Sequence, residues 1–499
     1  MAGVLRGKRA ALLLLTSVEL VVFLDVSIVN VALPAMGAAL GLTVVGLAWV
    51  GTAYQVTFGG FQLGAGRATD VLGRRRMFRI GLVVFTLGSL FAGIATEPWV
   101  LVTARALQGV GAAILVPAEL SLLTVMFTEP AAYRRAFGWW SAMGAVGAAG
   151  GVVLGGLIVE LFSWPWIFLI NVPIGLVGLL LSGRLLPPDA GSAGVRVRER
   201  LDLPGIVSGT AALLLLVYAV TVAAEGELDP FTGLLAVVGL AFGAVFVRVE
   251  LRSADPLLPF RFFRNPDITG CTVASVLVGA AHVPAFVFLA LYFQEVQDYT
   301  PLESGLAVLP VAAVNLVVSR TVVPPVLAAW GPRMVLTLGM AFLAAGLLML
   351  SRLPVGLDFM TDYLPGALIF AVGLPAVFVG ATLPAVKAVA ESETGVVSAV
   401  VNTAQRIGAG LGVAVLAALA EARTGPAGGG DVTALNEGYR LTFLGAALLA
   451  AAGVAVGLWL VRRGRSADAE DGRDRVRAEP EGPDAPAAGQ DRPAKAADV

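Results

Sequence analysis

Cysteine, histidine and charge are all scarce in this chain of 499 residues. A single cysteine, Cys271, excludes a disulfide framework, and a single histidine, His282, leaves too few ligands for a Cys/His metal site. Charged residues make up 14% of the chain, well below the ~25% typical of soluble domains. The formal net charge of -1 identifies no partner. We therefore expect no metal, no cofactor and no nucleic-acid partner.

The chain also has few means of hydrolysing ATP or catalysing a reaction. A phosphate-binding loop needs a lysine after a glycine at a fixed spacing, and none of Lys8, Lys387 and Lys495 stands in that pattern. No acidic residues cluster at metal-ligand spacing. We expect no ATP-binding motif and no enzyme, although an ATPase on a separate subunit stays open.

Long apolar runs dominate what is there. Hydrophobic residues make up 57% of the chain, and its mean hydropathy is +0.85. A helix that crosses a bilayer needs ~20 mostly apolar residues. By that measure we count fourteen candidate spans, roughly 11–36, 46–65, 78–96, 99–127, 134–160, 166–186, 205–224, 231–251, 268–293, 302–328, 333–352, 362–386, 394–420 and 439–462.

The positions of lysine and arginine predict how these spans are oriented. Nearly all of them fall before the first span or in alternate loops, whereas the other loops hold only Arg352, Arg423 and Arg440. Because cytoplasmic loops are enriched in these residues, both termini and the 66–76 loop are predicted to be cytoplasmic, in a multi-pass protein of the cell membrane. The first apolar run is too long for a cleaved signal peptide.

The spans and the charge pattern predict the domain organisation, in which a second six-helix half follows an added helix pair. The final residues are poor in large apolar side chains and are expected to be disordered. The segments are a cytoplasmic N-terminus (1–10), an N-terminal six-helix half (11–186), a cytoplasmic loop (187–204), the added pair (205–251), a second cytoplasmic loop (252–267), a C-terminal six-helix half (268–462) and a cytoplasmic tail (463–499).

Ionisable residues inside the spans are candidate functional groups, because each costs at least ~2.5 kcal/mol to insert. Arg105, Gln108 and Glu119 follow helical spacing and share one face of their span. A structural ion pair or side chains that extend to the membrane surface are the plainer explanations. Asp25 lies near mid-membrane, while Glu19 is closer to the cytoplasmic end and is expected to reach that surface.

Two further patterns stand out. Gly144, Gly147, Gly151 and Gly155 fall on one face of the 134–160 span, where they would let another helix approach closely. The segments 70–90 and 327–348 each place a glycine and an arginine just before a span, which is a weak internal repeat of the kind that transporters contain.

Five stretches together resemble signatures of the major facilitator superfamily, specifically its fourteen-helix drug:proton antiporter branch. They are "LDVSIVNVALP" (24–34), "GRATDVLGRRR" (66–76), "RALQGVGAA" (105–113), "YFQEVQDYTPLESGLAVLP" (292–310) and "GVVSAVVNTAQRIGAGLG" (395–412). The resemblance covers residues 10–462. It implies an all-α membrane protein with the major facilitator fold, in which two six-helix halves are supplemented by two additional helices.

The resemblance also implies roles for residues. Asp25 and Asn30 match the motif of the first helix, and Arg105 stands where the family's arginine is associated with proton coupling. The 66–76 run resembles the family's loop between helices 2 and 3, a cytoplasmic latch between the two halves whose arginines would pair with acids across the seam. The latch residues are Gly66, Asp70, Gly73, Arg74 and Arg75.

Two departures from the branch matter. Its glycine motif usually reads Gly-Pro-x-x-Gly-Gly, whereas "GVVLGG" (151–156) has Val152 in place of proline and ends at Gly155 and Gly156. In "SWPWIFLINVPIG" (163–175), Pro165 stands where arginine is usual. The first departure weakens the inference of antiport but leaves the inference of transport intact.

We therefore predict proton-coupled export of an amphipathic small molecule, such as a drug or antibiotic, by alternating access. Asp25 would exchange a proton against substrate, and Arg105 would tune Asp25 for this exchange. Glu119 would be a second carboxylate on the inner side. The alternatives are uptake or uniport by the same fold, and a membrane sensor or structural protein that transports nothing.

Overall fold

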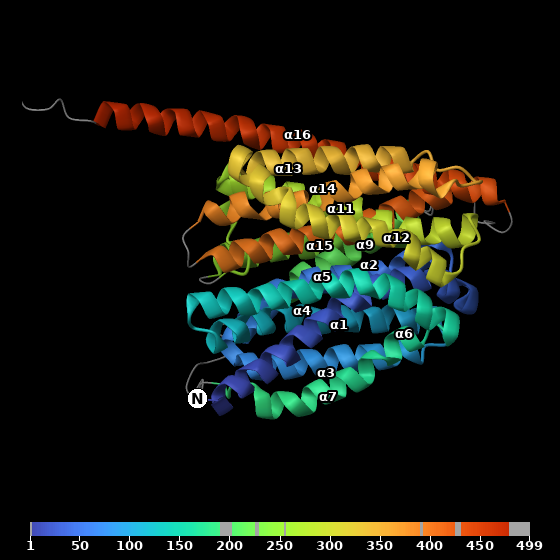
Figure 1. The fold of residues 1–499 in the computed structure, drawn as a ribbon, viewed down its shortest axis with the longest axis horizontal. Helices are drawn as coiled ribbons and strands as arrows, with labels where there is room; N and C mark the ends of the chain where they lie inside the picture. Colours follow the sequence, from blue (N-terminus) through green and yellow to red (C-terminus); the bar gives the residue numbers. More distant parts are fainter. Residues whose placement is uncertain are drawn as a thin grey trace, which may run out of the picture.

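The fold is taken from a computed structural model (Figure 1). The structure describes residues 2–189, 202–224, 229–253, 256–389, 393–424 and 431–478. Within those ranges every regular element is a helix. The elements are α1 (Ala2–Leu40), α2 (Val44–Leu72), α3 (Arg74–Gly93), α4 (Pro98–Met126), α5 (Pro130–Leu161), α6 (Trp166–Leu169), α7 (Asn171–Leu185), α9 (Leu203–Ala224), α10 (Pro230–Arg252), η1 (Phe260–Arg264), α11 (Pro266–Leu291), η2 (Tyr292–Val296), α12 (Pro301–Thr321), α13 (Val323–Leu350), η3 (Phe359–Tyr363), α14 (Leu364–Lys387), α15 (Thr394–Thr424) and α16 (Val432–Ala478).

Thirteen of the fourteen expected spans are long and apolar enough to cross a membrane, counted over the described residues. The fourteenth, α2, has ample length at 29 residues but is less apolar. The reason is its inward face, where Thr52, Gln55 and Thr57 are buried against other helices rather than exposed to lipid.

Local sequence explains where several helices begin. Asp229, Asn265 and Thr300 each precede a proline, and each side chain accepts a hydrogen bond from a backbone N–H of the following helix. Proline is tolerated in the first turn because its missing N–H would have no partner there. The Thr232 side chain and backbone N–H hold the pKa of Asp229 below its ordinary value.

The helices form two groups (Figure 1). In the first, α1 packs on α5, and α4 packs on both α2 and α3; in the second, α13 packs on α14 and α16, and α11 packs on α15. The pair α9 and α10 is added at the edge of the seam, where α9 contacts both α2 and α15. This arrangement matches the expected fold of two halves with an additional helix pair.

The two halves meet along α2 against α15 and α5 against α12. The backbone N–H of Val45 donates to the Glu421 carboxylate at 3.3 Å, and Gly156 lies against Pro301 and Leu302. These contacts lie at the end of the bundle opposite the 66–76 loop, where α1 finishes and α2 begins. The seam is therefore closed at that end.

The internal repeat has a matching backbone conformation in both halves. Gly73, just before α3, has φ 101°, and Gly331, inside α13, has φ 76°. Both values lie in the region that favours glycine. Gly331 breaks α13. The expected span 302–328 divides earlier, at Val322, between α12, which ends at Thr321, and the first turns of α13.

The last helix is longer than expected. Instead of ending near residue 462, α16 continues to Ala478, so the predicted tail begins inside the helix. The rest of that tail, residues 479–499, lies outside the described residues, as does 190–201 of the first predicted loop.

Candidate functional site

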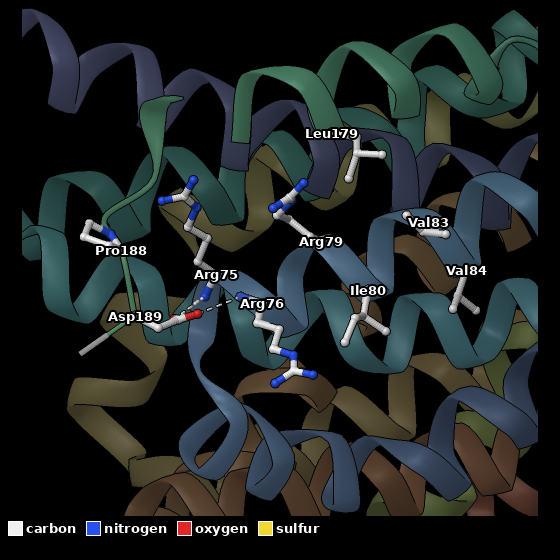
Figure 2. Close-up of a pocket in the computed structure, with 9 residues that line it drawn as sticks. All are labelled: Arg75, Arg76, Arg79, Ile80, Val83, Val84, Leu179, Pro188 and Asp189. Atoms are coloured by element: carbon white, nitrogen blue, oxygen red, sulfur yellow. Dashed lines mark hydrogen bonds between the residues drawn. The ribbon is translucent and has the colours of Figure 1, made fainter. Parts of the chain in front are cut away.

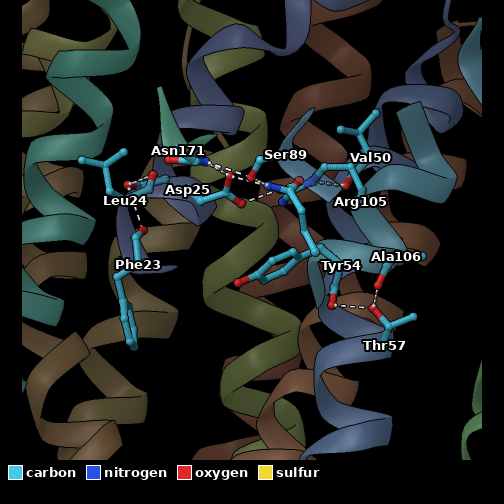
Figure 3. A network of polar contacts seen from close by, with 12 residues as sticks. Phe23, Leu24, Asp25, Val50, Tyr54, Thr57, Ser89, Arg105, Ala106 and Asn171 are labelled. Carbon is cyan, nitrogen blue, oxygen red and sulfur yellow. Dashed lines mark hydrogen bonds and ion pairs between the residues drawn. The ribbon is translucent and has the colours of Figure 1, made fainter. Parts of the chain in front are cut away.

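Asp25 and Arg105 form an ion pair between α1 and α4 (Figure 3). Arg105 Nη1 donates to Asp25 Oδ2 at 2.5 Å, and both side chains are almost fully buried. Each of these charges was singled out from the sequence because an isolated charge in a membrane is costly. The structure brings them together across 80 residues of chain.

The other oxygen of Asp25 is held by amides. Gln108 Nε2 donates to Asp25 Oδ1 at 2.9 Å, and Asn171 Nδ2 donates to the same oxygen at 3.0 Å. Gln108 Nε2 also donates to Ser89 Oγ at 2.7 Å, and Gln108 Oε1 accepts from Arg105. The Asp25 network (Asp25, Arg105, Gln108, Asn171 and Ser89) thus joins α1, α3, α4 and α7.

Arg105 is enclosed on its remaining sides. Its Nε donates to the backbone oxygen of Val50 at 3.1 Å, and its guanidinium carbon lies 4.5 Å from the Tyr54 ring centre and 5.7 Å from that of Phe168. Cation–π contacts are strongest when water is excluded. The guanidinium is therefore compensated by charge, by a carbonyl and by two aromatic rings.

Sequence reasoning found only part of the Asp25 network. Asp25, Arg105 and Gln108 were predicted, whereas Asn171 and Ser89 were not. Their only signal is a small polar residue within an apolar run, and such residues are tolerated in membrane helices for many reasons. Asn30, predicted from the motif of the first helix, is half-buried and joins no hydrogen bond of this network.

Glu119 belongs to a second buried site. It is 0% exposed, and Trp140 Nε1 donates to its Oε2 at 2.8 Å. The Glu19 carboxyl on α1 lies against it, within interaction distance. Glu119 Oε1 and Glu19 Oε2 are both buried with no hydrogen-bond partner.

The expectation that Glu19 reaches the membrane surface is wrong. Glu19 is 1% exposed, because its side chain faces Glu119 on α4 and lies beside Gly144 on α5. Its partner Glu119 does not extend to the surface either. We call these two residues the Glu19–Glu119 pair.

Arg406 reaches across the seam toward this pair. It lies on α15, and its Nη1 donates to Gln55 Oε1 on α2 at 3.2 Å. Its guanidinium carbon is 3.8 Å from the Phe58 ring centre, and its charge acts on Glu19. The sequence offered one signal for Arg406, namely a cation within a span, but no acidic neighbour that would predict its role.

The predicted glycine face packs on α1. A side chain at Gly147 would meet the Leu20 backbone at 2.4 Å, and one at Gly151 would meet Ser27 Oγ at 2.0 Å. Gly144 and Gly155 lie against the same helix, at Phe23 and Ile28. This contact is the close helix approach that the spacing predicted.

Gly156 has a different neighbour, because it faces the other half. A side chain there would meet the Pro301 backbone oxygen at 2.5 Å, and one at Gly305 would meet the Val152 oxygen at 2.6 Å. A Thr300–Glu303 capping box fixes the start of α12 at this crossing. Val152, which replaces the family's proline, therefore lies on the α5–α12 crossing.

The 66–76 run is almost entirely helical rather than a loop, because α2 ends at Leu72 and α3 begins at Arg74, with only Gly73 between them. This run, for which we keep the name 66–76 loop, is held by its own half (Figure 2). Arg74 Nε donates to Ser121 Oγ on α4 at 2.6 Å, and Arg75 Nη2 donates to the Gly183 oxygen. The Asp189 carboxylate accepts from the backbone N–H of Arg75 at 2.9 Å and of Arg76 at 3.1 Å. Asp189 thus caps α3.

These contacts differ from the expected latch, whose arginines would pair with acids of the other half. Among the described residues, the partners of Arg74 and Arg75 are Ser121, Gly183 and Asp189, and none of these lies in the second half. Gly73 makes room for Asp189, since a side chain at Gly73 would meet the Asp189 carboxyl at 2.4 Å, and Gly66 lies near Pro117. The side chain of Asp70 lies outside the described part of the chain.

Comparisons with known proteins agree with the fold. Solved structures with the same fold include the nucleoside transporter NupG (TM-score 0.64, 12% identity, 89% of this chain and 99% of that one). A bacterial homologue of the lysosomal transporter Spinster, in an inward-facing occupied conformation, is another (TM-score 0.62, 17% identity, 91% and 97%).

Closer relatives are known by sequence. The chain is 36% identical over 471 residues to the puromycin resistance protein pur8 of Streptomyces alboniger, covering 92% of both chains. It is 37% identical over 449 residues to the cephamycin export protein CmcT of Amycolatopsis lactamdurans, covering 88% of this chain and 89% of that one. Residues 15–413 match the family model of the Major Facilitator Superfamily. The chain belongs to the Major Facilitator Superfamily.

Proposed function

We propose that this chain exports an amphipathic small molecule in exchange for protons, by alternating access across the cell membrane. Family membership makes it a multi-pass transporter rather than an enzyme. Relatives named for puromycin resistance and cephamycin export support an antibiotic-like substrate moving outward. Both termini and the 66–76 loop would then face the cytoplasm, as the positions of lysine and arginine predict.

The observation that carries proton coupling is the Glu19–Glu119 pair. Two ionised carboxylates in contact, with water excluded, repel each other strongly, so such a pair is stable when it shares one proton. The unpartnered oxygens, Glu119 Oε1 and Glu19 Oε2, are free to hold that proton. The pair therefore supplies a proton-binding site within the membrane.

Arg406 connects this site to the movement of the two halves. The pair lies in the first half, whereas Arg406 belongs to α15 in the second. When one half rocks against the other, the cation moves relative to the pair. When the Arg406 guanidinium is close to the pair, it favours release of the shared proton. When the guanidinium is further away, the pair favours binding a proton. Proton exchange is thereby coupled to the conformational change.

The Asp25 network is the second part of this scheme. All of its members lie in the first half, and Arg105 compensates the Asp25 charge directly. Protonation of Asp25 would free Arg105, which already has a second acceptor in Gln108. Proton exchange at Asp25 thus stays a prediction, and the network also holds α1, α3, α4 and α7 together.

The test is transport by the purified full chain in liposomes with an imposed pH gradient, with puromycin and a cephamycin as first probes. We expect substrate to move against the proton flux and to stop when a protonophore removes the gradient. Substrate movement without proton movement would establish uniport and overturn antiport. No movement of any member of an antibiotic panel, in liposomes or in a host without its own pumps, would overturn export.

A further inference from the structure

A groove opens on the outer surface of the first half, between the start of α3 and the end of α7 (Figure 2). Its volume is about 500 Å³. One end carries three arginines, Arg75, Arg76 and Arg79, and the other end is apolar. Neither the Asp25 network nor the Glu19–Glu119 pair lines it.

The basic end has more positive charge than its own acid neutralises. Among the described residues Asp189 is the only acid that lines the groove, and its two oxygens accept from backbone N–H groups rather than from guanidinium groups. Arg75 is engaged by the Gly183 oxygen. Arg76 and Arg79 are exposed, and no carboxylate among the described side chains forms an ion pair with either.

Helix geometry concentrates this charge. Arg75 and Arg79 are four residues apart on one face of α3, a spacing at which like charges destabilise a helix. Figure 2 shows the Arg79 guanidinium near Leu179 of α7. An anion bound at this end would relieve the repulsion, and phosphate oxygens are good acceptors for arginine.

The apolar end continues along the membrane-facing surface of α3. After Ile80 and Val83, the exposed residues of this helix are Leu87 and Phe91, at steps of three and four. The stretch from Arg79 to Phe91 is about 18 Å long at 1.5 Å per residue. One leaflet of the hydrocarbon core is about 15 Å thick, half of the ~30 Å core.

We propose that this groove binds an anionic phospholipid. The phosphate sits between Arg76 and Arg79, with Arg75 behind it, and an acyl chain follows Val83, Leu87 and Phe91. A free phosphate would use only the basic end, whereas a phospholipid matches both halves of the groove. Basic pockets between membrane helices on the cytoplasmic side suit such headgroups.

The position gives the lipid a definite effect. The groove shares Arg75, Arg76 and Asp189 with the cap of α3. A bound phosphate there stabilises the join between the 66–76 loop, α3 and the segment after α7. The lipid thereby strengthens this end of the first half without touching the Asp25 network or the Glu19–Glu119 pair.

The test measures lipid binding to the full chain by native mass spectrometry, with phosphatidylglycerol, phosphatidylethanolamine and soluble glycerol 3-phosphate as probes. We expect phosphatidylglycerol to bind preferentially and glycerol 3-phosphate not to displace it. The double variant Arg76→Gln/Arg79→Gln should bind it about 30-fold more weakly, from ~1 kcal/mol per arginine near a membrane surface. Arg320→Gln, an exposed arginine at the same end of the bundle, is the matched control and should bind normally.

Hydrogen exchange in nanodiscs locates the binding site by a second measurement. It does not depend on lipid affinities or on whether the double variant folds. Phosphatidylglycerol should slow backbone exchange at residues 74–80 and 183–189 in the native chain and in Arg79→Lys, which keeps the charge. Equal exchange in anionic and zwitterionic nanodiscs overturns the proposal. Displacement by glycerol 3-phosphate, or equal loss of binding in Arg320→Gln, also overturns it, because the site would then bind free anions or reflect general charge.

Discussion

The guanidinium of Arg105 and the carboxylate of Asp25 compensate each other inside the protein, with side-chain exposures of 2% and 0%. Their surroundings are unequal. Arg105 also has the Val50 carbonyl and the Tyr54 ring, whereas the remaining partners of Asp25 are the amides of Gln108 and Asn171.

Because the two residues have different remaining partners, removing either charge should reduce the free energy of unfolding by a different amount. Arg105→Gln leaves a buried carboxylate without a cation and should reduce the free energy of unfolding by about 3–5 kcal/mol. Asp25→Asn should cost less, because Arg105 keeps its other contacts, and it should abolish proton-coupled transport at near-normal expression. Thermal unfolding in detergent and gradient-driven transport measure the two effects. Full gradient-driven export by Asp25→Asn would remove Asp25 from the coupling scheme.

Glu119→Gln should uncouple transport from the proton gradient. An amide cannot exchange a proton, so this variant should lose the pH dependence of export while still exchanging substrate down its own gradient. Glu160→Gln, an exposed carboxylate at the end of α5, is the control and should keep the native pH profile. If Glu119→Gln keeps that profile, the pair is structural and Asp25 becomes the remaining candidate.

Gly151→Leu should stop transport, whereas Gly150→Leu should not. A side chain at Gly151 would meet Ser27 Oγ at 2.0 Å and separate α5 from α1, but nothing lies within 4 Å of the same position at Gly150. The two variants carry the same added side chain on neighbouring residues, so insertion and expression serve as shared controls. Equal transport by both would show that the α1–α5 contact is dispensable.

Gly73→Ala should weaken the cap of α3. The residue has φ 101°, and a methyl group there would meet the Asp189 carboxyl at 2.4 Å. We expect a cost of about 1–3 kcal/mol and slower turnover with little change in substrate affinity. Gly138→Ala, where nothing lies within 4 Å, is the control. A collapse of substrate affinity at unchanged turnover would contradict a role of this loop in conformational exchange.

Introduced cysteines test the predicted orientation, because Cys271 is fully buried and should not react. A membrane-impermeant maleimide should label Glu97→Cys, before α4, in intact cells. It should label Glu129→Cys, at the other end of α4, only after permeabilisation. The reverse pattern would place the 66–76 loop outside the cell.

The sequence predicted the spans, and it singled out Asp25 and Arg105 separately as charges inside the membrane, for physical reasons. Apolar length determines which segments cross a membrane, and buried opposite charges need each other. Asn171 and Ser89 escaped prediction because small polar residues carry no comparable cost. Glu19 was misplaced because its distance from the end of the span does not show which way the side chain points, and it points toward Gly144 on α5 rather than toward the membrane surface.

The partners of the 66–76 arginines could not be predicted either. Which of several nearby acceptors an arginine contacts depends on tertiary packing, and Gly183 and Asp189 lie more than one hundred residues further along the chain. Long-range partners of this kind leave no local pattern. The glycine face was easier to predict, because its residues recur at helical spacing and together form the surface that contacts α1.

The polar side chains of α2 have a consequence for biosynthesis. Thr57 donates to the Ala106 oxygen of α4, but Thr52 donates to Gly410 of α15, and Gln55 accepts from Arg406 of the same helix. When α2 leaves the translocon, the ribosome is close to synthesising α4, which carries Ala106, but α15, which carries Arg406 and Gly410, is still far from being synthesised. The polar groups of α2 must remain near water or the insertion machinery until α15 arrives, so a nascent chain cut short before α15 should expose α2 to membrane quality control.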